Sequence, residues 1–394
     1  MISFKTHLSE EKTPGAISHL KHFEEGALEN SKSAMTSIDR LQNLDKHLQG
    51  KRSTVKSIGI KADGSPSFQA GYTVDPVDGQ RKFGVAYKGA AKGYAFSKSD
   101  VNKLFGHAPA LASKIGQILD HGPKVWPDEG IYQGDFMGSK RDETITKSKG
   151  HIHQKENTIT YTSPANSKEG KKLDNAKISL AIHTRIDKSE PEYNVDTSNF
   201  REHPDVHMFN MKLPRDSITY TPEAQERVSK HLNAAMKAHG SIADHDELVN
   251  NHTEDLKTYI NSTVRNDKDL STDDYANFVR DKYVGQRDKL KTDIAKNRKT
   301  EEMNSRLNHI DTNKKDFDSL MSMHDHLEKA KNVMVKAING AKQNYEHSIN
   351  GSPSDPEGSA INFKDGQPDS LVKGVVRRKA DGGFSAANFA ARPR

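Results

Sequence analysis

The sequence has no cysteine and a single tryptophan. The absence of cysteine excludes disulfide bonds, thiolate zinc sites and cysteine nucleophiles, and it is compatible with a reducing compartment. Apolar side chains are also scarce, because hydrophobic residues make up 32% of the 394 residues and charged residues 29%. This balance still differs from that of a disordered chain, so we expect one well-packed domain together with polar, helix-rich segments.

Long apolar segments are missing as well. No run approaches the roughly 20 residues that a membrane-spanning helix needs, and the first eight residues become charged too early for a signal peptide. We therefore expect a soluble, cytoplasmic protein without a membrane partner. Its net charge of +6 and pI ≈ 9.0 suit a polyanionic partner such as nucleic acid.

The first half of the chain changes from a helical to a strand-like pattern. Residues 17–49 carry apolar side chains at helical spacing, interrupted by Gly26. Residues 58–185 alternate short β-type runs with turns, and the runs 67–74 and 82–87 predict a hairpin. We also expect a helix at 101–119 and further strands at 131–137, 157–162 and 177–186.

From about residue 215 the pattern becomes helical. Thr221-Pro222-Glu223 combines a hydroxyl cap, a proline in the first turn and an acid, which predicts a helix start. Ser271 predicts another start, and the longest helical pattern covers residues 303–338. Turn residues 351–356 end this region, and strand-like runs return at 359–363 and 370–377.

Together these patterns predict an α+β protein with four segments. Residues 1–57 form an N-terminal helical segment, and 58–214 form the first part of a strand-rich domain with an antiparallel sheet. Residues 215–350 form a helical insertion, after which 351–394 return to complete the sheet. The insertion separates the two parts of the strand-rich domain, which is therefore discontinuous in the sequence.

Three groups of residues in this discontinuous domain are suited to chemistry. Lys61-Ala62-Asp63-Gly64 directly follows the apolar run 58–60, so a lysine ends a strand and enters a polar turn. Burial and neighbouring cations favour the free, nucleophilic amine of a lysine held in such a pocket. Gly134-Asp135 ends another predicted strand, and Glu357-Gly358 is followed by Val372-Lys373.

The order of these motifs resembles that of the covalent nucleotidyltransferases, which include ATP-dependent RNA and DNA ligases and messenger RNA capping enzymes. Lys61 to Gly64 fits their Lys-x-Asp-Gly motif fully. Asp135 stands where their next motif commonly has the longer glutamate, and Ser359 is less apolar than is usual after their Glu-Gly pair. Val372-Lys373 resembles their closing lysine motif.

A closer resemblance is to uncharacterised RNA-ligase-like proteins of tailed phages. The similar segments are 79–88, 133–135, 157–161, 181–184 and 384–389. They span most of the chain outside the helical insertion. The resemblance implies a nucleotidyltransferase fold interrupted by that insertion, a lysyl-AMP intermediate, and ATP and Mg²⁺ as cofactors.

The resemblance also implies individual roles. Lys61 would attack the α-phosphate of ATP, and Lys373 would offset the charge that develops on it. Glu357 would hold Mg²⁺, while Asp135 would contact the metal or the ribose. The nucleotide-binding residues would be Lys61, Asp63, Lys88, Tyr132, Asp135, His183 and Lys373, with Tyr132 and His183 as the candidates for stacking on the base.

The same residues allow other interpretations. A Lys-x-Asp-Gly segment alone is usually an exposed turn with a solvated lysine, and Asp135 could cap a turn. The leading hypothesis is an RNA ligase that acts on nucleic-acid ends, with RNA favoured over DNA. The alternatives are nucleotidyl transfer to a protein or small molecule, and a degenerate nucleotide-binding phage protein that acts through its helical insertion.

Basic residues between 280 and 299 offer a second possible contact with nucleic acid. Acidic residues are interleaved with them, which is typical of a solvated helix face. Binding to nucleic-acid phosphates is the alternative.

Overall fold

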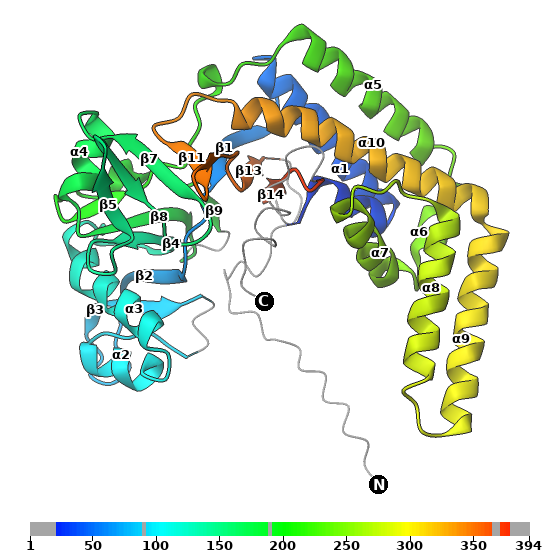
Figure 1. The fold of residues 1–394 in the computed structure, drawn as a ribbon, viewed down its shortest axis with the longest axis horizontal. Helices are drawn as coiled ribbons and strands as arrows, with labels where there is room; N and C mark the ends of the chain where they lie inside the picture. Colours follow the sequence, from blue (N-terminus) through cyan, green and yellow to red (C-terminus); the bar gives the residue numbers. More distant parts are fainter. Residues whose placement is uncertain (1–20, 89–91, 188–190, 365–370, 379–394) are drawn as a thin grey trace. The chain divides into compact units, whose positions relative to one another are not determined.

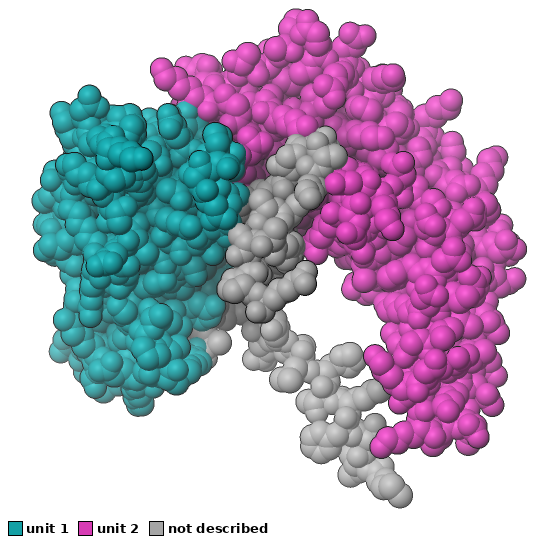
Figure 2. Space-filling view, in the orientation of Figure 1, with its two compact units in different colours: residues 1–20, 61–212, 343–354 teal, residues 21–60, 213–342, 355–394 magenta. Residues whose placement is uncertain are grey.

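The computed structural model describes residues 21–88, 92–187, 191–364 and 371–378 (Figure 1). It confirms an α+β protein with antiparallel sheets. The described chain forms two compact units (Figure 2). Unit 1 contains Lys61–Lys212 and Gln343–Ser354, and unit 2 contains Lys21–Ile60, Leu213–Lys342 and the described residues from Asp355 onward. Within the described ranges, no helix has the length and apolar character needed to cross a membrane.

Unit 1 is built on two sheets. The larger has the strand order β10-β8-β4-β2-β3, with β9 beside β8, and the smaller has the order β12-β11-β7-β6-β5. The strands of the larger sheet are β2 (Ser67–Val74), β3 (Arg81–Tyr87), β4 (Ile131–Ser139), β8 (Ile178–Arg185), β9 (Glu192–Tyr193) and β10 (Val206–Met208). Those of the smaller sheet are β5 (Ile145–Ser148), β6 (His151–Gln154), β7 (Thr160–Pro164), β11 (Glu346–Ile349) and β12 (Ser352–Pro353). The helices are α2 (Lys98–Phe105), α3 (Pro109–His121) and α4 (Lys168–Asn175).

The larger sheet has one apolar face. Side chains alternate along β2, so Phe68 and Ala70 enter a core that also contains Trp126, while Gln69 lies on the other face. Trp126 is fully buried, and its indole N–H donates to the Ala70 carbonyl at 3.1 Å. Helix α3 contacts β3 and β8 and adds Ile118 to this core. The core therefore fixes which polar residues share the opposite face of the sheet.

Unit 2 combines most of the helices with a small sheet of order β1-β13-β14. Helix α10 runs through the middle of the unit and contacts α5, α1, β13 and β14, and Figure 1 shows α8 and α9 side by side. The strands are β1 (Val55–Lys61), β13 (Gly358–Phe363) and β14 (Leu371–Gly374). The helices are the 3-10 helix η1 (Phe23–Leu28) and α1 (Ser31–Leu48), α5 (Pro222–His239), α6 (His245–Val249), α7 (Thr253–Arg265), α8 (Thr272–Arg287), α9 (Asp293–Thr312) and α10 (Lys314–Asn339).

A cluster of charged side chains is buried inside unit 2. The Lys331 ammonium lies 2.6 Å from a carboxylate oxygen of Glu24, and both side chains are 0% exposed. The Arg377 guanidinium reaches the same oxygen at 2.8 Å. Burial alone would raise the pKa of Glu24, but Lys331 and Arg377 outweigh it and hold that pKa well below its usual value. Burial lowers the pKa of neighbouring His324 to about 3. We call Glu24, Lys331 and Arg377 the buried ion cluster.

Several expected elements are confirmed. The hairpin of β2 and β3 forms as predicted, with Gly71 opposite Gly84. Thr221 and Ser271 cap α5 and α8, because each hydroxyl accepts a hydrogen bond from the backbone N–H three residues later.

Three expected helices are each interrupted. The pattern at 17–49 contains η1 and α1, separated where Asn30 caps α1. The helix expected at 101–119 is α2 followed by α3, since Pro109 begins a new helix. The pattern at 303–338 contains the end of α9 and most of α10, which meet at Asn313. Hydrophobic spacing continues across each break and so concealed it.

The C-terminal strands belong to a different sheet from the one we expected. β13 pairs with β1, and β14 pairs with β13, so neither strand extends the larger sheet of unit 1. The reason is packing, because Ile361, Phe363 and Val372 enter the same core as the helices of unit 2. The predicted end of this segment, from residue 379 onward, lies outside the described residues.

Candidate active site

Lys61 is the last residue of β1 and the first described residue of unit 1. The turn that follows it is fastened to β4. The Ser65 backbone N–H donates to the Phe136 carbonyl at 2.8 Å, and the Phe136 N–H donates to the Pro66 carbonyl at 3.0 Å. This pair of backbone hydrogen bonds holds the lysine-bearing turn beside the middle of the larger sheet.

Asp63 anchors the same turn from inside. Its side chain is buried and accepts three hydrogen bonds, from the Asn157 side-chain amide at 2.7 Å and from the backbone N–H groups of Thr158 and Ile159 at 2.8 and 2.9 Å. Its own backbone N–H donates to the Tyr161 hydroxyl at 2.7 Å. The expected contact of Asp63 with the nucleotide therefore needs correction, because this carboxylate positions the turn.

Gly64 permits the close approach of the turn to β4. A Cβ atom at this position would lie 2.7 Å from the Phe136 carbonyl oxygen and 2.8 Å from the Cβ of Asp135. Backbone cannot yield to such a contact, so any other residue would push the turn away from Asp135. The Lys-x-Asp-Gly sequence thus has a local structural explanation in both its aspartate and its glycine.

Removing the Asp63 carboxylate should destabilise unit 1. We expect Asp63→Ala to lower the free energy of unfolding by about 3 kcal/mol or more, because three N–H donors, that of Ile159 among them buried, lose a charged and buried acceptor. The measurement is urea unfolding followed by fluorescence of Trp126, the only tryptophan, which is buried in the core of unit 1. Asp128→Ala removes an exposed, ion-paired carboxylate and is the control, expected to change stability by under about 0.5 kcal/mol. Equal effects of the two substitutions would contradict the anchoring role.

Four of the predicted residues gather on the polar side of unit 1. Ser67 lies opposite Asp135, and the Lys88 backbone N–H donates to the Ser67 carbonyl, so Lys88 and Asp135 flank one position of β2. The imidazole Nε2 of His183 lies 3.9 Å from the Asp135 carboxylate. Burial is the main reason that the pKa of His183 is lowered; Lys61 and Lys88 lower it further, and Asp135 opposes them. Lys61, Lys88, Asp135 and His183 thus form one electrostatically coupled group.

Tyr132 does not belong to this group. Its ring is 4% exposed and packs against Phe200 at 5.0 Å and Trp126 at 6.3 Å between ring centroids. The Arg185 guanidinium lies over the ring at 5.7 Å from its centroid. The expectation that Tyr132 stacks on a base is therefore corrected, because strand alternation turns this side chain into the core.

Two glutamines that the sequence interpretation missed lie on the same polar side. Gln69 and Gln133 are opposite each other on β2 and β4, and they are only 1% and 3% exposed. The Tyr94 hydroxyl donates to the Gln69 side-chain oxygen at 3.2 Å. Among the described residues, Gln69 Nε2 and Gln133 Oε1 have no hydrogen-bond partner. On this polar side, the two amides thus have one donor and one acceptor whose hydrogen bonds the described residues do not supply.

A signal for these glutamines was present in the sequence. Gln69 interrupts the apolar run of β2 between Phe68 and Ala70, and Gln133 precedes Asp135 by two residues, which places both on one face of β4. Polar residues in the middle of a buried strand are costly unless they have partners. Sequence alone did not indicate that the two strands pair in this register.

Glu357 and Lys373 belong to the small sheet of unit 2 and its edge. Glu357 directly precedes β13, and Lys373 in β14 lies opposite Ala360. A Cβ at Gly358 would lie 2.6 Å from the Gly374 carbonyl oxygen, so the glycine is required where the two motifs meet. β13 is the neighbour of β1, the strand that ends at Lys61. The meeting of this pair with the group in unit 1 stays a prediction.

Among the described residues, no group of three or more histidine, aspartate or glutamate side chains is arranged to hold an ion. Mg²⁺ is commonly bound through one or two carboxylates together with substrate phosphates. Asp135 and Glu357 have the hard oxygen donors that this mode of binding requires.

The fold and the site define an α+β protein that carries a strand-end lysine beside a carboxylate, an imidazole and a second lysine. The chain belongs to DUF6267, a family of unknown function whose model matches residues 18–392. No curated protein and no solved structure matches the chain.

Proposed function

We propose that this protein is an ATP-dependent nucleotidyltransferase that forms a lysyl-AMP intermediate and acts on nucleic-acid ends as an RNA ligase. The observation that carries the proposal is the coupled group of Lys61, Lys88, Asp135 and His183 at the end of β1. A nucleophilic lysine beside a second cation and a carboxylate is the combination that phosphoryl transfer to an amine needs.

The chemical step begins at the side-chain nitrogen of Lys61. Its nitrogen attacks the α-phosphorus of ATP, a P–N bond forms, and the bond from that phosphorus to the pyrophosphate oxygen breaks. The amine gives up its proton, and pyrophosphate leaves with the electron pair. Lys88 would offset the charge on the phosphate oxygens, and Lys373 would do so from β14. Asp135 and Glu357 would hold Mg²⁺, which neutralises phosphate charge when bound.

The base of the nucleotide would occupy the place marked by the two glutamines. Gln69 Nε2 is a donor and Gln133 Oε1 an acceptor, and neither has a partner among the described residues. Adenine presents an acceptor nitrogen next to its N6 amino donor, which complements this pair. Tyr94 fixes the orientation of the Gln69 amide by donating to its oxygen. The His183 imidazole stays a candidate for stacking.

The proposal is tested by incubating the full chain with α-labelled ATP and Mg²⁺, followed by denaturing electrophoresis. We expect a label that survives denaturation, is lost in acid and is removed by added pyrophosphate. Protein freed of bound nucleotide that takes no label from any of the four nucleotides would overturn the proposal. Transfer of the label to the 5′ end of an RNA or DNA strand would then distinguish a ligase from an enzyme that transfers the nucleotide to a protein or small molecule.

Selectivity for adenine should depend on the glutamine pair. We expect the protein to bind ATP at least about tenfold more tightly than GTP, and Gln69→Leu or Gln133→Leu to remove most of this preference, since tenfold corresponds to about 1.4 kcal/mol and one hydrogen bond supplies a similar amount. Equilibrium binding to the Lys61→Ala protein measures this without covalent product.

A matched control exists in the same unit. Gln154 in β6 is fully buried, and neither end of its amide has a hydrogen-bond partner among the described residues. Gln154→Leu should leave the ratio of ATP to GTP affinity unchanged. If Gln69→Leu and Gln133→Leu also leave this ratio unchanged, the base is recognised elsewhere.

A further inference from the structure

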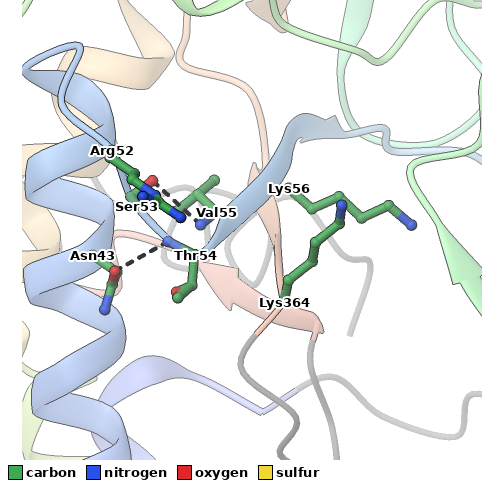
Figure 3. Close-up of a pocket in the computed structure, with 7 residues that line it drawn as sticks. All are labelled: Asn43, Arg52, Ser53, Thr54, Val55, Lys56 and Lys364. Carbon is green, nitrogen blue, oxygen red and sulfur yellow. Dashed lines mark hydrogen bonds between the residues drawn. The ribbon is translucent and has the colours of Figure 1, made fainter.

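A positively charged pocket opens at the start of β1 in unit 2 (Figure 3). Its volume is ≈ 510 Å³, and the described part of its lining contains three cationic side chains and no acidic one. The lining residues are Asn43, Arg52, Ser53, Thr54, Val55, Lys56 and Lys364. They come from α1, from the connection to β1, from β1 itself and from the residue after β13.

Hydrogen bonds donated by backbone N–H groups hold the pocket in shape. The Thr54 N–H donates to the Asn43 side-chain oxygen at 3.1 Å, and the Lys364 N–H donates to the Thr54 carbonyl at 2.7 Å. The Ser53 hydroxyl accepts from the Val55 N–H at 3.3 Å. Helix α1 and strands β1 and β13 therefore all contribute to one fixed frame.

No carboxylate of the described residues pairs with the charges that face this frame. Within the described ranges, Arg52, Lys56 and Lys364 form no ion pair, and all three are exposed. Figure 3 shows the Lys56 and Lys364 side chains next to each other, with Arg52 and Asn43 on the other side of the pocket. Three cations held near one cavity without an anion favour the binding of an anion.

A second observation points to a ligand. The Thr54 hydroxyl is buried and has no hydrogen-bond partner among the described residues, although it belongs to the pocket lining. A hydroxyl donor among cations is the arrangement that binds phosphate oxygens. The pocket is also separate from the α-phosphate site, because seven residues of β1 span about 20 Å from one end to the other.

We infer that this pocket binds the phosphodiester backbone of a nucleic-acid strand, through Arg52, Lys56, Lys364 and the Thr54 hydroxyl. The choice of a strand over another polyanion rests on the proposed function. A ligase must hold a strand at some distance from the reacting phosphate. The pocket supplies such a contact from the N-terminal helix and the start of β1.

The test is fluorescence anisotropy with labelled single-stranded RNA and DNA of the same sequence, without Mg²⁺. We expect the triple variant R52Q/K56Q/K364Q to bind both strands at least about tenfold more weakly. For this variant, the slope of log affinity against log salt concentration should become less steep by about 2, because each phosphate contact with a single strand contributes about 0.7 to that slope. Thr54→Val, which removes no charge, should weaken binding by about threefold.

A matched variant removes the same charges from the helical region. R298Q/K289Q/K291Q replaces one arginine and two lysines that are exposed in or next to α9, where the alternative basic surface lies. It should keep the affinity and the salt dependence of the unaltered chain. An equal loss in both triple variants would overturn the inference, as would an unchanged affinity in R52Q/K56Q/K364Q.

Small anions provide the remaining distinction. Inorganic phosphate and ATP should compete with the strand only weakly at equal phosphate concentration, and full competition would show a site for a small anion and overturn the inference. Labelling by ATP should be the same in R52Q/K56Q/K364Q as in the unaltered chain. The inference can thus fail while the proposed lysyl-AMP chemistry stands, and strand binding can persist if no label forms.

Discussion

Replacement of Lys61 by alanine is expected to abolish covalent labelling by ATP, with a loss of at least about a thousandfold. The physical reason is that the P–N bond has no other nitrogen to form on. Lys88 also lowers the pKa of His183, but it follows β3 and not β1. Its backbone N–H is bound to the Ser67 carbonyl, so Lys88 lies on the opposite side of Ser67 from Asp135. A thousandfold loss corresponds to about 4 kcal/mol of transition-state stabilisation.

Lys61→Arg sharpens this prediction. Arginine keeps the positive charge and much of the length of the side chain, but its guanidinium stays protonated and cannot attack phosphorus. We therefore expect labelling to be lost in Lys61→Arg as completely as in Lys61→Ala, while ATP binding measured at equilibrium changes by only a few-fold. A purely electrostatic role of Lys61 would instead leave Lys61→Arg active.

The control for both variants is Lys98→Ala. Lys98 lies at the start of α2 in the same unit, is well exposed and is not among the residues proposed to bind nucleotide. Its labelling should equal that of the unaltered chain. If Lys61→Ala is still labelled to a similar extent, another residue carries the nucleotide and the proposed function is wrong at its central point.

The largest effect on stability is expected from Lys331→Met. This substitution keeps the volume and length of the side chain but leaves the fully buried Glu24 carboxylate without its nearest cation. Breaking a buried ion pair by removing one partner costs about 3–5 kcal/mol. Unfolding in urea, followed by the far-ultraviolet circular dichroism of the helices, should show a loss in this range.

Two further variants separate pairing from packing. Lys329 lies two residues from Lys331 on α10 and pairs with Asp325 at the surface. Lys329→Met should therefore change the free energy of unfolding by under about 0.5 kcal/mol. Without Lys331, the buried Arg377 faces two carboxylates, Glu24 and Glu328. Adding Glu24→Gln to Lys331→Met should recover part of the lost stability, because it leaves Arg377 with one of them. If the double variant is as unstable as the sum of the two single variants, the loss is one of packing and the pairing argument does not hold.

The sequence predicted local features well because local rules control them. Thr221 and Ser271 cap helices through hydrogen bonds that span three residues, and the hairpin of β2 and β3 closes within one turn. The position of Lys61 at a strand end follows from the short apolar run before it. Each of these features depends on neighbours in the sequence.

Local rules do not predict features that depend on residues far away in the sequence. The role of Asp63 is set by Asn157 to Ile159, and the orientation of Tyr132 by a core that includes Phe200. The pairing of Gln69 with Gln133 required the register of β2 and β4. An apolar strand also gives no indication of which sheet it joins, so β14 was assigned to the wrong one.

The buried ion cluster has a consequence for biosynthesis. Glu24 precedes nearly all of unit 1 in the chain, whereas Arg377 follows it. A ribosome adds about 5–20 residues per second, so a nascent chain carries Glu24 for many seconds before Arg377 has been made. The continuous segment Lys61–Lys212 can meanwhile collapse around Trp126. The interior of unit 2 cannot be neutralised until Arg377 has been made, so we expect this unit to mature after Lys61–Lys212 has collapsed.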